Sequence, residues 1–169
     1  GGVNRRSVAE LALHFILGCV RGSFTSHHEV QNNKWAQFKG QNLSGKTVGL
    51  LGLGYVGKEL APMLKPLNVK ILAFDLFPKS DFCKLHDIQQ LTLEEVLVRS
   101  DVVSLHLPLT TQTKNILSSD NLNLLKRGCF LVNTARGGMI DEDHLAQMLA
   151  SRHVQSAAFD VFEKEPPLE

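Results

Sequence analysis

Three glycines in the order Gly52-x-Gly54-x-x-Gly57 are the first residues of this chain whose spacing could serve chemistry. Such a turn lets the backbone approach a pyrophosphate closely, and the following helix offers unpaired N–H groups and the positive end of its dipole. Asp75 stands further along, where a carboxylate would accept hydrogen bonds from the hydroxyls of an adenosine ribose. Because a carboxylate repels a 2′-phosphate, the pattern favours NAD over NADP, although Lys79 lies nearby in the sequence.

A glycine turn binds a dinucleotide only between a strand and a helix, and the hydrophobic pattern predicts both. Short apolar runs without helical period predict strands over 46–51, 69–74, 101–107, 129–133 and 154–161. Helical patterns predict helices over 8–20, 56–67, 93–99, 119–126 and 141–152. Because strand and helix alternate, we expect an α/β protein with a doubly wound parallel sheet, the Rossmann fold, in three layers α/β/α.

Local signals support several of these boundaries. Thr92 with Glu95 forms a capping box before the helix over 93–99, and Ser7 with Glu10 forms one for the helix over 8–20. Pro62 is expected to bend or weaken the helix over 56–67.

The composition bounds the class of protein. With 169 residues, 43% of them hydrophobic, and a formal net charge of +1, the chain should fold around a core as one domain with extra pieces. The charge balance gives no support to a nucleic-acid or membrane partner, so small molecules remain the expected ligands. Cys19, Cys83 and Cys129 lie far apart without a CxxC pair or a histidine at ligand spacing, which predicts a reduced, cytoplasmic protein without a metal site.

The N-terminal residues resemble a secretory signal at first sight. Arg5 and Arg6 precede an apolar run over 11–20, but this run is too short to span a bilayer and contains His14. An amphipathic helix is therefore the favoured interpretation. Since the chain begins with Gly1 rather than Met, we expect it to be a piece of a longer protein.

Further motifs occur in an order that resembles a known family. They are Ser7-Val8-Ala9-Glu10, Trp35, the glycine turn, His106-x-Pro108-Leu109-Thr110-x-x-Thr113, Asn133-Thr134-Ala135-Arg136-Gly137-Gly138 and Asp160-Val161-Phe162-x-x-Glu165-Pro166. Together they resemble the nucleotide-binding domain of the D-isomer-specific 2-hydroxyacid dehydrogenases. The Arg-Gly-Gly version of the fifth motif is most similar to that of D-3-phosphoglycerate dehydrogenases.

The resemblance implies a cofactor role for most of these residues. It assigns Gly52, Gly54, Tyr55, Val56 and Gly57 to the cofactor turn, Asp75 to the ribose, and His106, Pro108 and Thr113 to the cofactor cleft. It places Thr134, Ala135 and Arg136 on the nicotinamide side and makes Asp160 the acceptor for the carboxamide. The implied cofactor is NAD.

Arg136 is also the candidate catalytic residue. A guanidinium can bind the carboxylate of a 2-hydroxy acid through two parallel hydrogen bonds and polarise the carbonyl at which hydride arrives. The resemblance implies that Glu165 pairs with a catalytic histidine, although a solvated loop charge is an alternative reading of Glu165. In the family that histidine follows the Glu-Pro motif, beyond Glu169.

None of the seven histidines present is expected to replace it. His27, His28 and His86 are predicted in loops, and His106, the only candidate near the cleft, is expected to contact the cofactor. We therefore expect the chain to be inactive alone.

The resemblance also implies a domain plan. Residues 1–24 would be an interdomain and dimerisation helix, 25–45 a connection, and 46–169 the NAD-binding domain, with the substrate domain and C-terminal end absent. The expected function is hydride transfer between NAD and a D-2-hydroxy acid, with 3-phosphoglycerate and serine biosynthesis favoured and a homodimer as the assembly. An NAD-sensing, corepressor-like binding protein of the same family is the alternative.

Overall fold

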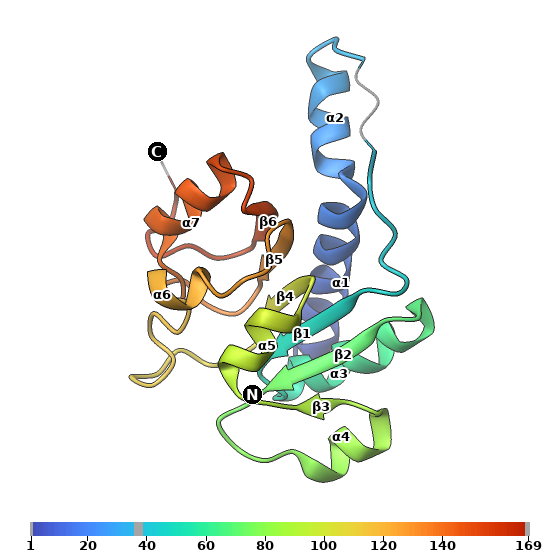
Figure 1. Cartoon of the computed structure of the whole chain (residues 1–169), viewed down its shortest axis with the longest axis vertical. Coiled ribbons are helices and arrows are strands. Elements are labelled where there is room, and N and C mark those ends of the chain that lie inside the picture. Colours follow the sequence, from blue (N-terminus) through green and yellow to red (C-terminus); the bar gives the residue numbers. More distant parts are fainter. Residues whose placement is uncertain (1, 36–38, 168–169) are drawn as a thin grey trace.

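The computed structural model describes residues 2–35 and 39–167, which form a sheet flanked by helices (Figure 1). The strands are β1 (Thr47–Leu51), β2 (Lys70–Phe74), β3 (Gln89–Gln90), β4 (Val102–Leu105), β5 (Cys129–Asn133) and β6 (Val154–Phe159). The helices are α1 (Arg5–Arg21), α2 (Ser23–Gln31), α3 (Tyr55–Leu64), α4 (Ser80–His86), α5 (Leu93–Arg99), α6 (Ser119–Leu122) and α7 (Glu142–Ala150), with a short 3-10 helix η1 (Lys65–Leu67) after α3.

All neighbouring strands are parallel, in the order β3-β2-β1-β4-β5-β6. The central strands are buried on both faces, as a parallel sheet between helices requires. One core contains apolar residues of α5, α6 and α7, and the core on the opposite face contains those of α1, α3 and α4. The predicted doubly wound α/β fold in three layers is confirmed.

The order of the strands creates a crevice at one edge of the sheet. From β1 the chain continues to β2 on one side, whereas β4 lies on the other side of β1. Ligands of such sheets bind outside the carboxyl ends of the strands at this switch point. The glycine turn follows β1 and His106 follows β4, so both lie at this crevice.

Several predicted boundaries are confirmed. The helix over 93–99 and the strand over 129–133 have the predicted limits, and the capping box of Thr92 with Glu95 is present. Pro62 lies within α3 without ending it; the helix ends at Leu64 and tightens into η1.

Other predictions were wrong. The helix over 119–126 ends at Leu122, because Leu124 and Leu125 donate to carbonyls only three residues back and so form tight turns. The strand over 101–107 is shorter, since β4 ends at Leu105. Neither α4 nor the two-residue β3 was predicted, because seven and two residues carry too little periodicity to be recognised, and α2 was not predicted either.

The first helix begins earlier than predicted and lacks the predicted capping box. α1 starts at Arg5 after Asn4, and no side chain caps it. Glu10 instead accepts from Arg6 Nε at 2.7 Å, and Arg6 Nη1 donates to Glu59 of α3 at 3.1 Å. Glu10 is therefore paired with Arg6 and does not reach the backbone of Ser7, and Arg6 also links α1 to α3.

α1 also contributes to the core of the nucleotide-binding fold. Ala9, Ala12 and Ile16 are fully buried against the sheet and α3. The buried face of α1 therefore packs as part of this fold, and the role of residues 1–24 in joining domains or in dimerisation stays a prediction.

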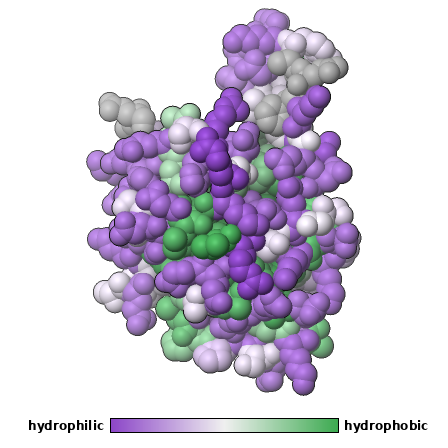
Figure 2. Space-filling view, in the orientation of Figure 1, coloured by the Kyte–Doolittle hydropathy of each residue, from purple (hydrophilic) through white to green (hydrophobic). Residues whose placement is uncertain are grey.

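The polar stretch over 25–45, predicted as a connection, contains most of α2. None of its helical residues is buried, and the helix projects away from the sheet with a largely polar surface (Figures 1 and 2). His27 and His28 lie on α2 and His86 on α4, so the prediction that they occupy loops was wrong.

In the described part of the chain no single helix is long and apolar enough to cross a membrane. Only α1 and α2 taken together, with a bend of 70° between them, have the length and the apolar composition of a membrane span.

Candidate functional site

The glycine turn lies flush against the end of β4. Gly52 has φ +108°, and a Cβ there would lie 2.8 Å from the His106 carbonyl carbon. A Cβ on Gly57 would lie 2.1 Å from the Gly52 carbonyl oxygen, so only glycine lets α3 begin this close to β1. A Cβ on Gly54 would meet no atom within 4 Å, which leaves an open side at the N-terminus of α3.

The two residues after this turn differ in exposure. Tyr55, the first residue of α3, is 63% exposed. Val56 is partly buried and packs against the core. Tyr55 can therefore contact a ligand in the crevice, whereas Val56 holds the helix against the sheet.

Asp75 is fixed directly beside the turn. Its Oδ2 accepts from the backbone N–H of Leu53 at 2.7 Å, and its Oδ1 accepts from that of Phe77 at 3.0 Å. A carboxylate has about four lone-pair positions, so these two bonds leave acceptor capacity for further hydroxyl groups. The side chain is only 8% exposed, which gives the carboxylate one defined position at the end of β2.

His106 directly follows β4, and its backbone lies against Gly52 of the glycine turn. Its Nε2 lies 2.9 Å from Ser104 Oγ, and its buried Nδ1 has no hydrogen-bond partner among the described residues. Burial lowers the pKa of His106 to about 4, so the ring is neutral near pH 7. A neutral ring suits a contact with a bound group and not the relay of a proton near neutral pH.

Thr113 shapes the loop after His106 and does not face an opening. Its hydroxyl donates to the Pro108 carbonyl at 2.5 Å and accepts from the Thr110 N–H at 2.8 Å. The side chain is fully buried, whereas Pro108 is exposed. Of the cleft residues that the resemblance assigned to this loop, Pro108 is thus accessible, whereas Thr113 is buried and supports Pro108 through this hydrogen bond.

Asn133 holds the turn after β5. It is part of the motif over 133–138, but the sequence patterns gave it no role of its own. Its Oδ1 accepts from the Ala135 N–H and its Nδ2 donates to the Arg136 carbonyl, both at 3.0 Å. This bracket leaves Thr134 buried with an unpartnered Oγ1 among the described residues, while Arg136 is exposed. The sequence did hold one signal for Asn133. A side-chain amide at the end of a predicted buried strand needs hydrogen-bond partners nearby.

Arg136 extends from this turn toward solvent. Its Nη1 donates to the Ala135 carbonyl at 2.6 Å. Within residues 2–35 and 39–167 it forms no ion pair with a carboxylate. The guanidinium therefore keeps donors for an anion.

Gly137 brings a second segment beside Arg136. A Cβ on Gly137 would clash with the Phe162 carbonyl, so the loop that carries Glu165 lies directly against the turn. Glu165 is exposed and its Oε1 accepts from the Phe162 N–H at 3.0 Å. Asp160 is exposed as well, and its N–H donates to the Asn133 carbonyl at 3.0 Å.

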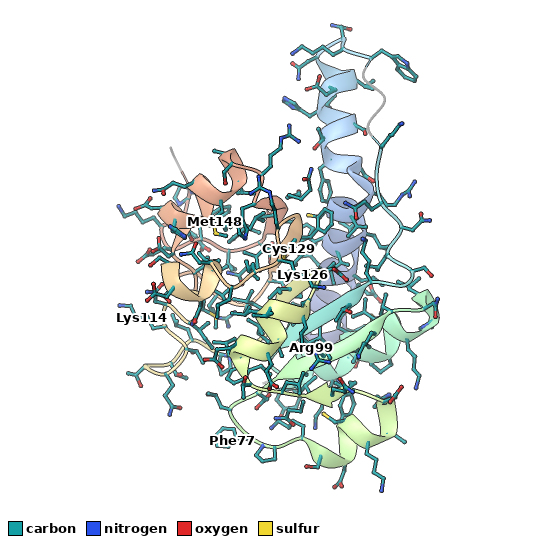
Figure 3. The ribbon with its side chains drawn as sticks, in the orientation of Figure 1. Phe77, Arg99, Lys114, Lys126, Cys129 and Met148 are labelled. Carbon is teal, nitrogen blue, oxygen red and sulfur yellow. The ribbon has the colours of Figure 1, made fainter. Side chains whose placement is uncertain are left out.

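The two candidate catalytic residues share one cavity. It has a volume of about 460 Å³ and is lined by Leu109, Lys114, Arg136, Gly137, Gly138, Phe162, Glu163 and Glu165. A larger hollow of about 1100 Å³ shares Lys114 and Glu165 with it and extends toward α7. Figure 3 labels Lys114, which lies on the loop before α6 and lines both hollows.

No histidine contacts Glu165 in the described part of the chain. His144 Nε2 lies 3.0 Å from Asn123 Oδ1, and His153 Nε2 lies 2.8 Å from the Leu125 carbonyl. The described residues contain no group of three or more side chains that could hold a metal ion. The groups that the site offers for chemistry are the Arg136 guanidinium and the Glu165 carboxylate, which line one cavity.

The comparison with family models decides what this crevice belongs to. Residues 13–169 match the model of the D-isomer specific 2-hydroxyacid dehydrogenase NAD binding domain. The chain belongs to this family. The expected family and its cofactor, NAD, are thereby confirmed.

Proteins with several different names are similar to this chain. A hydroxypyruvate reductase from Thermotoga maritima is 38% identical over 98% of this chain, which covers 54% of the relative. A D-3-phosphoglycerate dehydrogenase from Bacillus subtilis is 36% identical over 98% of the chain and 32% of the relative. An NAD-dependent formate dehydrogenase from Staphylococcus aureus, solved in complex with NAD, aligns with a TM-score of 0.90 and 34% identity over 98% of this chain and 51% of its own.

The chain spans between a third and about half of the length of these proteins. The residues present fit the cofactor of the family. At Gly52 and Gly57 a Cβ would clash with backbone atoms, so these glycines let β1, β4 and α3 approach closely. Gly54 leaves open space at the N-terminus of α3, where a diphosphate would meet free N–H groups. The unpartnered His106 Nδ1 and Thr134 Oγ1 are buried polar atoms that a ligand can satisfy.

Proposed function

We propose that this chain is the NAD-binding part of an enzyme that transfers hydride between NAD and a D-2-hydroxy acid. The observation that carries the proposal is the shared cavity of Arg136 and Glu165 beside the polar crevice. A cation without a carboxylate partner and an accessible carboxylate are the two groups that a 2-keto acid and a proton-carrying imidazole would need.

Each residue then has a defined task. Arg136 would bind the substrate carboxylate and polarise the carbonyl group, since its side chain lines the cavity and Asn133 holds its backbone carbonyl. Glu165 would accept a hydrogen bond from an imidazole outside these 169 residues and favour its protonated form. Bound NAD supplies or accepts the hydride.

Cofactor orientation would fall to the crevice. Asp75 would bind the adenosine ribose, and Thr134, Ala135 and Asp160 would line the nicotinamide side. Tyr55 and Pro108 are exposed enough to contact the cofactor, whereas Val56 and Thr113 would support it indirectly.

The substrate that we favour is 3-phosphoglycerate, which would place the enzyme in serine biosynthesis. Its support is the Arg136-Gly137-Gly138 motif and the second cation, Lys114, on the same cavity. The names of the relatives include hydroxypyruvate, phosphoglycerate and formate enzymes, so activity assays with each acid are the direct test.

A homodimer is the assembly we propose. Its support is α2, a nine-residue helix without a buried residue, next to Trp35 with 86% of its surface exposed. An isolated helix of this length is marginal in water, so a partner surface would stabilise it. Analytical ultracentrifugation of wild type and Trp35→Ser tests this: a shift of the variant toward monomer is expected, and a wild-type monomer at all concentrations would contradict it.

We also propose a cytoplasmic location. Its support is that Cys19, Cys83 and Cys129 are unpaired and buried, as suits a reducing compartment. The binding partners that we propose are small 2-hydroxy and 2-keto acids. We propose no nucleic-acid or membrane partner.

The decisive experiment compares the longer protein that would carry this chain with the chain alone. We expect NADH oxidation with a 2-keto acid only by the longer protein, and loss of that activity in its Arg136→Lys variant. Turnover by the 169 residues alone would contradict the division of catalytic groups. If the longer protein binds NADH but never transfers hydride, the corepressor-like alternative replaces the enzyme.

A further inference from the structure

Asp75, the carboxylate expected to bind the adenosine ribose, forms an ion pair with Lys79. Lys79 Nζ lies 3.7 Å from Asp75 Oδ1. The Asp75 side chain is 8% exposed and that of Lys79 is 25% exposed, so solvent screens this pair less than a pair on the open surface. The local charge at the ribose end of the crevice is therefore close to neutral and not negative.

Gln90 of β3 holds the segment that carries Lys79. Its Oε1 accepts from the Lys79 backbone N–H at 2.8 Å, and its Nε2 donates to the Phe77 carbonyl at 3.0 Å. Lys79 Nζ also lies 5.7 Å from the centre of the Phe77 ring. The lysine is thus anchored at its backbone by one residue and along its side chain by another, and its charge has a defined place.

Another cation of this neighbourhood has a different partner. Lys58 of α3 lies over the Phe82 ring, 5.3 Å from its centre. Within the described residues it forms no ion pair with Asp75. Lys79 is accordingly the cation that counters the Asp75 charge at close range.

We propose that Lys79 determines how strongly this site discriminates between NAD and NADP. Once Asp75 accepts from the ribose hydroxyls, any group on the 2′-oxygen lies beside the Asp75 carboxylate and within reach of the Lys79 ammonium. A lone carboxylate would repel a 2′-phosphate, whereas the pair of Asp75 and Lys79 offers attraction as well as repulsion. Lys79 therefore narrows the preference for NAD that Asp75 creates.

The proposal rests on the assignment of Asp75 to the ribose, and its test separates the two. The dissociation constants of NADH and NADPH are measured on the whole 169-residue chain by the fluorescence of the reduced nicotinamide. The variants are Lys79→Gln, Asp75→Asn, both together, and Lys84→Gln. Lys84 is the matched control, because it is an exposed lysine in the last turn of α4, the helix that begins directly after Lys79.

We expect Lys79→Gln to weaken NADPH about tenfold relative to NADH, because solvent and salt reduce a partly exposed charge pair to a fraction of its full Coulomb energy. Asp75→Asn should tighten NADPH relative to NADH, since the unpaired ammonium then faces the 2′-phosphate. The double variant should lose that gain, and Lys84→Gln should resemble wild type.

Two results would overturn the proposal. One is a ratio of the two dissociation constants that stays unchanged in Lys79→Gln while Asp75→Asn shifts it, which would leave Asp75 as the only discriminating residue. The other is an equal loss of NADH and NADPH in Lys79→Gln, which would reduce Lys79 to support of the loop. A wild-type chain that binds neither nucleotide would overturn the ribose assignment and the proposal together.

Discussion

Gly137 lies so close to Phe162 that a Cβ on Gly137 would be 1.9 Å from the Phe162 carbonyl oxygen. This approach joins the turn after β5 to the loop after β6, and it places Arg136 and Glu165 on one cavity. The two candidate catalytic residues are 29 positions apart in the numbering (165 minus 136), yet they share a wall because this one position lacks a side chain.

Gly137→Ala should therefore separate the two loops. Backbone cannot yield as a flexible side chain can, so we expect a loss of about 1–3 kcal/mol in the free energy of unfolding. Chemical denaturation measures this loss, and proteolysis should cut the loop after β6 faster in the variant. Gly54→Ala is the control, because a Cβ there meets nothing within 4 Å. Equal stability of Gly137→Ala and wild type would contradict the close approach.

The glycines of the cofactor turn should separate folding from binding. Gly57→Ala would place a Cβ 2.1 Å from the Gly52 carbonyl, so it should lower the melting temperature as well as the affinity for NADH. Gly54→Ala should leave the melting temperature close to wild type and still weaken NADH by about tenfold or more, because its Cβ would occupy space reserved for the diphosphate. Calorimetric melting and NADH titration of both variants provide the comparison. Full NADH affinity in Gly54→Ala would place the diphosphate elsewhere.

His106 should make stability depend on pH in a specific window. Burial lowers its pKa in the folded protein from 6.5 to about 4, so the unfolded chain binds a proton more readily. The stability from a neutral His106 is complete above pH 6.5 and is lost progressively as the pH falls from 6.5 toward 4. His106→Gln should flatten this part of the profile, and His27→Gln on the exposed α2 should not.

Asp101 should affect the free energy of unfolding at a lower pH than His106, so the two contributions can be distinguished. Although burial opposes ionisation, hydrogen bonds from the Thr47 N–H and Lys126 keep the pKa of Asp101 below its ordinary value of 3.8. Its contribution is present above pH 3.8 and is lost only as the pH falls through the lowered pKa. Urea unfolding from pH 8 to pH 3 measures both windows, and a flat wild-type curve between 6.5 and 4 would refute the burial of His106.

Arg136→Lys in the longer protein should impair turnover without impairing the cofactor. A lysine keeps the charge but cannot make two parallel bonds to a carboxylate, so kcat/KM for the keto acid should fall about a hundredfold. The dissociation constant of NADH should change less than about threefold, since the positive charge at position 136 is kept and none of the glycine-turn residues lines this cavity. A large loss of NADH affinity with unchanged kcat would make Arg136 a cofactor ligand only.

Local patterns predicted most elements because their signals lie within a few residues. The apolar run over 129–133 and the capping box of Thr92 with Glu95 need no knowledge of the fold. The same reasoning failed for the capping box of Ser7 with Glu10, where Glu10 pairs with Arg6, which also reaches Glu59 of α3. A side-chain ion pair involving α3, which is far away in the sequence, formed there in place of the predicted capping box.

The candidate site shows the same division. The order of motifs identified the family and the types of residue that an NAD-binding domain needs, since glycine spacing and charge at strand ends are written along the chain. Only the tertiary structure decided that Thr113 is buried as a support, that Asn133 brackets Arg136, and that Lys79 neutralises Asp75. These facts depend on contacts between loops that parallel strands bring to one edge of the sheet, and a hydrogen bond or an ion pair across that edge has no signature in either segment alone.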